Sequence, residues 1–157
     1  MRHNYTMENV GPKTNILKVS AKLKKSLLSA GTVEPIQPQQ CLFDVDQENQ
    51  GVYLVMKGKV RLYVRDYSRL DRVFSAGSLL GVPATFTGHT YSLGATAVTA
   101  AQVVHVGQKA FLDLLTQQPE LCREATDLLS REVTYIQAAL AERRRSKSES
   151  HAEMAAS

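Results

Sequence analysis

Tryptophan is absent from the 157-residue sequence, and cysteine occurs only twice. Cys41 and Cys122 lie far apart in the sequence, and neither belongs to a Cys-x-x-Cys pair. Disulfide frameworks and zinc ribbons need more cysteines at closer spacing, so the sequence excludes both classes. Because each cysteine lies beside a leucine, we expect two buried thiols.

Long apolar runs are missing as well. No stretch approaches the roughly 18 apolar residues that a membrane-spanning helix needs. The N-terminal residues also lack the apolar segment of a secretory signal peptide. We therefore expect a cytoplasmic protein that makes no use of a membrane.

The residue patterns of catalysis and metal binding are missing too. The four histidines include no His-x-His pair, which a metal-binding β-barrel of the cupin type needs. No G-x-S-x-G or P-loop pattern occurs, and Ser92 has no evident histidine and acid partner. We therefore expect no enzyme activity, no metal and no cofactor, and a cupin-type enzyme is the weakest alternative.

The charge that is present is mainly basic, with 19 Lys and Arg against 15 Asp and Glu. The cations gather near the two ends of the chain: Lys18, Lys22, Lys24, Lys25, Arg143, Arg144, Arg145 and Lys147. Solvated helix faces are the simplest interpretation. For the segment 143–147, a phosphate-binding arm and a helix end that favours cations both stay open.

The apolar pattern changes its period along the chain. Residues 1–13 are polar, and we expect them to be flexible. Apolar residues at a spacing near 3.6 predict a helix from Thr14 or Asn15 to Ala30. From Thr32 to Val106 the period is two, which predicts strands over 32–36, 40–43, 51–56, 59–65, 70–74, 91–99 and 102–106. Lys57-Gly58 is predicted to form a tight hairpin turn.

The helical period returns after Val106. A short helix is predicted over Gln108–Gln117, and Pro119 suits the first turn of a second helix that runs to about Arg145. That helix would be about 40 Å long, more than a small β-barrel can cover. Its apolar seam has a spacing close to a 4-3 repeat: Cys122, Leu129, Val133, Ile136 and Leu140. We expect Arg131 and Glu132 to flank this seam, and residues 146–157 to form a disordered tail.

Four segments, in the order LVMKGKVRLY, AGSLLG, YSLGATA and QKAFLDLLTQQPEL, resemble the sensor domain of the Crp/Fnr family of regulators. More broadly, they resemble the cyclic nucleotide-binding domain superfamily. The resemblance covers about residues 14–145. It implies a mainly β fold, an antiparallel β-barrel or jelly roll (double-stranded β-helix) with an N-terminal helix and a long C-terminal helix. It also implies a homodimer that pairs through helix 119–145, with these candidate contacts: Leu129, Val133, Ile136 and Leu140.

The phosphate-binding segment of the family is altered in this sequence. In relatives that bind cyclic AMP, a glutamate next to a glycine binds the ribose hydroxyl, and a later arginine pairs with the cyclic phosphate. The resemblance places Gly81 at the glycine, Val82 at the glutamate and Tyr91 at the arginine, with Ser92 at a small hydroxyl position. A buried phosphate without a counter-charge has a large desolvation cost. We therefore do not expect cyclic AMP to bind in the usual way.

Two interpretations of this segment stay open, a live small-molecule site and a vestigial pocket filled by side chains. A live site would favour an unknown neutral or amphipathic effector, because its side chains are hydroxyl-bearing or apolar. The candidate ligand-binding residues are Gly81, Val82, Pro83, Ala84, Thr85, Tyr91, Ser92 and Leu93, with Phe86 as a further apolar wall.

The DNA-binding helix-turn-helix of the Crp/Fnr family follows the long helix, and too few residues follow Arg145 to form it. We therefore expect no direct DNA binding. The sequence favours a non-enzymatic regulatory or sensor module with a degenerate phosphate-binding cassette. The alternative is a protein–protein interaction module with a vestigial pocket, which dimerises with full-length regulators through its long helix.

Overall fold

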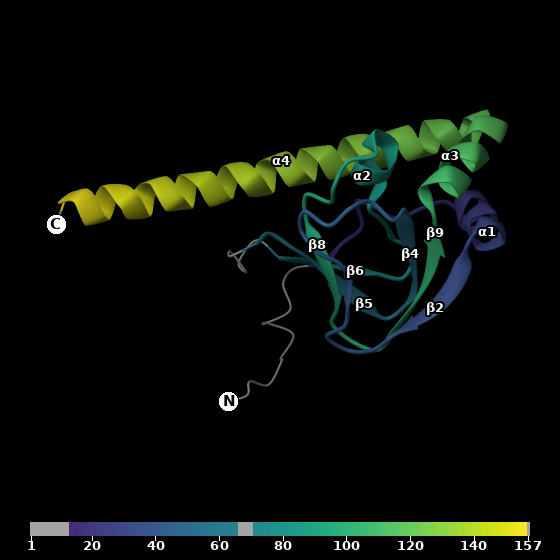
Figure 1. The fold of residues 1–157 in the computed structure, drawn as a ribbon, viewed down its shortest axis with the longest axis horizontal. Coiled ribbons are helices and arrows are strands. Elements are labelled where there is room, and N and C mark those ends of the chain that lie inside the picture. The colour runs from purple at the N-terminus through teal and green to yellow at the C-terminus, as the bar shows by residue number, and fades with distance from the viewer. Residues whose placement is uncertain (1–12, 66–70, 157) are drawn as a thin grey trace.

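The computed structural model describes residues 13–65 and 71–156 (Figure 1). Two β-sheets form the body of the molecule, and helices flank them. The expected mainly β fold with flanking helices is confirmed. In the described residues the two sheets do not close into one barrel, which corrects that detail of the expectation. The expected flexible N-terminus, apart from Lys13, lies outside the described residues.

The first sheet has the strand order β1-β6-β5-β8-β3. Its strands are β1 (Lys13–Thr14), β3 (Cys41–Phe43), β5 (Lys59–Tyr63), β6 (Arg72–Ser75) and β8 (Gly94–Ala97). All its pairings are antiparallel except that of β1 with β6. The short β1 was not predicted from the sequence.

The second sheet is antiparallel throughout and has the order β2-β9-β4-β7. Its strands are β2 (Thr32–Ile36), β4 (Val52–Lys57), β7 (Leu79–Leu80) and β9 (Ala101–Val106). The bounds of β2 agree with the prediction, whereas the two-residue β7 is too short to show a period and was missed.

The predicted hairpin at Lys57-Gly58 is wrong. Strand β4 pairs with β7 and β9, whereas β5 pairs with β6 and β8, so the chain passes from one sheet to the other at this turn. Gly58 has a φ of 87°, which L side chains rarely adopt. A Cβ there would lie 2.4 Å from the carbonyl oxygen of Ala100, so a glycine is required.

Helix α1 (Ala21–Ala30) starts later than the sequence indicates. The hydroxyl oxygen of Ser20 accepts a hydrogen bond from the backbone N–H of Leu23 and caps the helix. Residues before Ser20 are held by the backbone of residues 77–79 instead: the N–H of Val19 donates to Gly77, and the N–H of Leu79 donates to Leu17. The apolar residues of this segment therefore do not belong to a helix.

Helices α3 (Gln108–Gln117) and α4 (Pro119–Ala156) follow the sheets. The bounds of α3 and the start of α4 agree with the prediction. Residues 146–156, expected to be disordered, are part of α4, which extends well beyond the sheets (Figure 1). The side of α4 that is buried carries Leu121, Ala125, Leu128, Glu132 and Ala139.

Two apolar clusters form the core. One lies between the two sheets and includes Phe43, Phe74 and Tyr91. The other lies under the helices and includes Leu23, Phe111 and Leu128. The cysteines are not buried in either cluster: Cys41 is exposed and Cys122 is half-buried, so the expectation of two buried thiols is wrong. In strand β3, Leu42 points to the core and the alternation turns Cys41 outward, whereas Cys122 on α4 packs in part against the core under the helices.

Candidate functional site

The candidate site begins where β7 ends and the short helix α2 (Val82–Thr87) starts. Gly81 precedes the helix with a φ of 89°. A Cβ at this position would lie 3.1 Å from both the carbonyl oxygen of Gly51 and the ring of Tyr91. The sequence Gly-Val-Pro therefore starts a helix in a place where a larger residue would meet strain and crowding.

Tyr91, which the sequence resemblance places at the position of the family's arginine, lies against the start of this helix. Its ring stacks on Phe43 with 4.0 Å between the ring centroids. Its hydroxyl donates to the carbonyl oxygen of Gly51 at 2.7 Å and accepts from the N–H of Gln50 at 3.0 Å. Burial raises the pKa of Tyr91 to about 12. The Tyr91 side chain is thus neutral, and ring stacking and hydrogen bonds hold it in the core.

Glu132, on α4, faces the start of α2 from the other side. The residue is only 5 % exposed. Burial raises the pKa of its carboxyl to about 8, although hydrogen bonds from the backbone N–H groups of Gly81 and Val82 act in the opposite direction. The Oε1 atom of Glu132 is buried and finds no hydrogen-bond partner among the described residues. Glu132, which was expected to flank the apolar seam together with Arg131, is therefore buried within its own chain.

Little space remains between these groups. A cavity of about 20 Å³ lies there, lined by Phe43, Leu62, Gly81, Pro83, Ala84, Tyr91, Ser92, Leu93, Glu132 and Ile136. Small-molecule pockets usually measure about 300–1,000 Å³. A volume of this size suits about one water molecule. In this conformation the site has no room for a nucleotide.

The structure brings most of the candidate ligand-binding residues together around this cavity: Gly81, Pro83, Ala84, Tyr91, Ser92 and Leu93. Val82 is fully buried in the core under the helices, so its side chain does not line the cavity. Thr85 donates its hydroxyl to the carbonyl oxygen of Gly81 at 2.8 Å. Phe86 packs edge-on against Phe111. These three side chains support the local fold rather than face the cavity.

Sequence reasoning missed Glu132 as a member of this site. A signal was present, because Glu132 continues the register of Leu121, Ala125 and Leu128, which are all buried. A glutamate on a long helix is normally exposed. The predicted apolar seam instead follows the apolar residues one position further along the helix. It therefore lies on a neighbouring side of α4.

The four candidate dimer contacts are all half-buried on α4. Ile136 and Leu140 pack in part against the core between the sheets, and Leu129 packs against the core under the helices. Val133 belongs to neither cluster. Of the four candidate contacts, Val133 is therefore the one that packs least against the core of its own chain.

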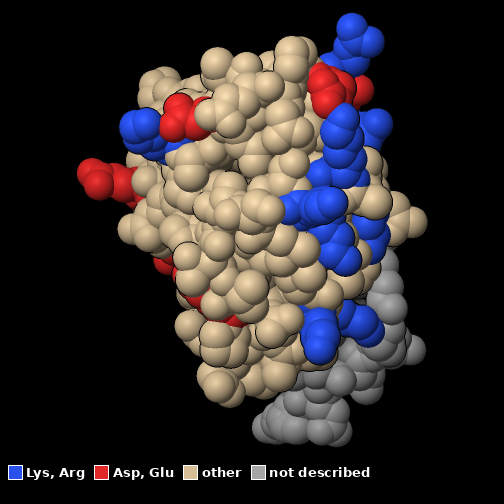
Figure 2. All heavy atoms as spheres, turned by 90° about the vertical axis from the view of Figure 1, so that its right-hand side faces the viewer, with Lys and Arg blue, Asp and Glu red and all other residues tan. Residues whose placement is uncertain are grey.

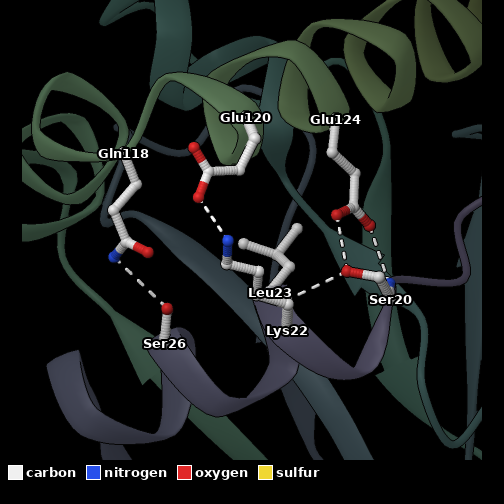
Figure 3. A network of polar contacts seen from close by, with 7 residues as sticks. All are labelled: Ser20, Lys22, Leu23, Ser26, Gln118, Glu120 and Glu124. Atoms are coloured by element: carbon white, nitrogen blue, oxygen red, sulfur yellow. Dashed lines mark hydrogen bonds and ion pairs between the residues drawn. The ribbon is translucent and has the colours of Figure 1, made fainter.

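The first turns of α4 are joined to α1 by polar contacts (Figure 3). The carboxylate of Glu124 accepts from the backbone N–H of Ser20 at 2.7 Å and from its hydroxyl at 2.6 Å. Lys22 forms an ion pair with Glu120, in which both side chains are more than half exposed. These contacts place a second carboxylate of α4 at a helix N-terminus, here in contact with water.

A larger hollow, of about 560 Å³, lies between α1 and α3 and was not predicted. It is an open surface groove lined by Lys22, Lys25, Ser26, Ser29, Ala30, Ala110, Asp113, Leu114, Gln117 and Gln118. Figure 2 shows this end of the molecule, where Lys and Arg gather along one side. Lys22 and Asp113 already form ion pairs, with Glu120 and Lys109 respectively. The groove thus has little free charge of its own.

Residues 13–65 and 71–156 contain neither a membrane span nor a metal cluster. In this part of the chain, no helix combines the length and the apolar character needed to cross a bilayer. Nor do three or more His, Cys, Asp or Glu side chains gather there as a metal site would require.

Comparison with known proteins gives a family match. A model of the family described as "Cyclic nucleotide-binding domain" matches residues 33–118, which is more than half of the chain. The match includes α2 and Tyr91 but ends before Glu132. A search of curated protein sequences gives no match.

Solved structures with the same fold have low sequence identity. One, from work on a cyclic-GMP-dependent signalling pathway that regulates bacterial phytopathogenesis, has a TM-score of 0.65 and 19% identity, over 77% of this chain and 96% of that one. The catabolite activator protein of Thermus thermophilus has a TM-score of 0.56 and 20% identity, over 88% and 61% of the two chains. Oxidised CprK in complex with o-chlorophenolacetic acid has a TM-score of 0.63 and 15% identity, over 87% and 57%. This chain thus spans about three fifths of the last two proteins.

Proposed function

As this chain belongs to the cyclic nucleotide-binding domain family, we propose that it is a non-enzymatic regulatory module of the Crp/Fnr kind that does not bind cyclic AMP in the usual way. Its structural neighbours lie in the Crp/Fnr regulator family. The observation that carries the proposal is the cavity of about 20 Å³ among the candidate ligand-binding residues. Tyr91, which the resemblance places at the arginine position, offers no positive charge.

A ligand titration tests the first part of this proposal. We expect no change in the thermal midpoint with cyclic AMP or cyclic GMP at millimolar concentration, because a ligand raises apparent stability only if it binds the folded chain. A catabolite activator protein that binds cyclic AMP serves as the positive control. A saturable upward shift of the wild-type midpoint with either nucleotide would contradict the proposal.

The second part of the proposal is that α4 carries the output and pairs with a second copy. The helix has 38 residues and extends beyond the sheets. A helical segment without a packing partner is only marginally stable in water, which favours pairing. Val133 is the best position for a test, because its side chain belongs to neither core cluster.

Sedimentation velocity of Val133→Glu tests the pairing. We expect the wild type to sediment as a dimer and the variant as a monomer with unchanged helix content. Gln137→Glu, at an exposed position one turn further along, is the matched control and should remain dimeric. A dimer that survives Val133→Glu, or a wild type that is monomeric at micromolar concentration, would refute this part.

A second candidate function is an interaction module that pairs with full-length regulators through α4. The closed cavity favours it, since a module without an effector can still present a helix. Co-expression of the tagged chain with a full-length Crp/Fnr-type regulator from the same source would test it. We expect a mixed dimer that Val133→Glu abolishes, and recovery of the tagged chain alone would exclude this candidate.

A further inference from the structure

We propose that the carboxyl group of Glu132 is a built-in occupant of the amide-lined start of α2, so that this pocket stays closed against α4 and rejects anionic ligands. The inference rests on the proposed function, because it concerns the regulation of the same pocket.

The geometry supports an internal occupant. The free N–H groups at a helix N-terminus attract anions, and those of Gly81 and Val82 are directed to the Glu132 carboxyl. The residue is only 5 % exposed and is part of the lining of the remaining cavity, and its Oε1 atom has no partner among the described residues. A ligand anion would therefore have to displace Glu132 from both amides before it could bind.

The groups that face Glu132 provide no positive charge. Helix α2 has the sequence VPATFT and contributes no ionisable side chain. The ionisable neighbours that interact with Glu132 are Tyr91, which precedes β8, and Tyr135 on α4. Burial raises the pKa of both phenols, so both are neutral in the physiological range. Asp71 and Arg72, on and beside β6, act on Tyr135 rather than on Glu132.

Two consequences follow from this arrangement. When Glu132 is protonated, its carboxyl group already occupies the backbone amides that a phosphate would need. When Glu132 is ionised, its negative charge has no counter-ion and repels the phosphate. The carboxyl also links stability to pH. Because its pKa is raised in the folded state to about 8, its contribution is fully present below its ordinary pKa near 4.5 and is lost as the pH rises through about 8.

The first test compares thermal midpoints of the wild type and Glu132→Gln between pH 6 and pH 9, without any ligand. Glutamine keeps the shape of the side chain and an acceptor for the two amides but cannot ionise. We expect the wild-type midpoint to fall by several degrees over this range and the variant's midpoint to stay nearly flat. Glu124→Gln, which changes the exposed carboxylate two turns earlier, should follow the wild type. Parallel curves for the wild type and Glu132→Gln would overturn the proposal.

The second test adds inorganic phosphate at pH 6.5 to Glu132→Ala, which leaves the amides of Gly81 and Val82 without an acceptor. We expect phosphate to raise the midpoint of this variant in a saturable way, and to leave the wild type and Glu124→Ala unchanged. An equal shift in all three proteins, or none in a folded Glu132→Ala, would contradict anion rejection. Should Glu132→Ala not fold, the glutamine comparison still decides the proposal. That comparison uses no nucleotide and no partner, so its result is separate from the tests of the proposed function.

Discussion

Helix α4 meets the N-termini of two other helices with a carboxylate, and the two junctions differ in one respect. Glu124 reaches the start of α1, where it accepts two hydrogen bonds from Ser20 in contact with water. Glu132 reaches the start of α2, where it is 5 % exposed and one oxygen has no partner among the described residues. In both contacts a carboxyl group of α4 lies at the start of another helix, and burial raises the pKa of Glu132.

The pKa values of two glutamates of α4 are shifted in opposite directions, and the causes differ. The hydrogen bond from Lys22 lowers the pKa of Glu120, whose side chain is more than half exposed. Burial raises the pKa of Glu132 to about 8. One helix can therefore hold an ionised carboxylate at one junction and a neutral carboxyl at the other at the same pH.

The largest difference in stability between the two junctions should appear when the carboxylate of each junction is removed. At pH 6 we expect Glu132→Ala to lower the free energy of unfolding by about 2–3 kcal/mol, because two buried N–H groups lose their acceptor. Glu124→Ala should cost about 1 kcal/mol or less, because water replaces the lost acceptor. Urea unfolding of both variants measures the difference. Equal losses would show that burial does not distinguish the junctions.

A cap substitution sharpens the comparison from the side of α1. Ser20→Ala removes the acceptor for the N–H of Leu23 and one of the two contacts with Glu124. We expect a loss of about 1 kcal/mol, with the same pH profile as the wild type. Ser20→Thr, which keeps a hydroxyl that can both cap the helix and donate to Glu124, is the matched control and should lose little stability. A loss above that of Glu132→Ala would reverse the ranking.

The smallest effect should come from the exposed ion pair. Lys22→Ala removes the partner of Glu120, and both side chains are more than half exposed. Exposed pairs of this kind contribute little and are screened by salt. We expect a thermal midpoint that is indistinguishable from that of the wild type at high salt. A clear loss that persists in 1 M salt (about 3 Å Debye length) would show a structural role for the pair.

Periodicity was sufficient for the elements that pack by a regular pattern. Helix α3 has the predicted bounds, because its apolar residues repeat over several turns. Strand β2 also has the predicted bounds, although Ile36 is its only buried residue. The start of α1 was wrong because backbone contacts with residues 77–79 hold the preceding segment in an extended form. Such contacts are long-range and leave no trace in the local pattern.

The candidate site was predicted only in part. The glycine, the proline and Tyr91 were found through the resemblance, and they do line the cavity. Glu132 was expected to flank the apolar seam, because a glutamate on a helix is normally exposed. Its helical register with buried residues of α4 was not taken into account. A buried carboxyl is recognised by what surrounds it in three dimensions, and no local spacing records the two amides of Gly81 and Val82.

The most direct measurement is an NMR titration of the glutamate side-chain carboxyl carbons, with Glu132→Gln and Glu120→Gln used to assign the two signals. We expect the Glu132 signal to titrate with a midpoint near 8 and the Glu120 signal to titrate below its ordinary value of about 4.5. A Glu132 midpoint at or below that of Glu120 would show an exposed or ion-paired carboxylate, and would contradict a closed pocket occupied by a buried, neutral carboxyl.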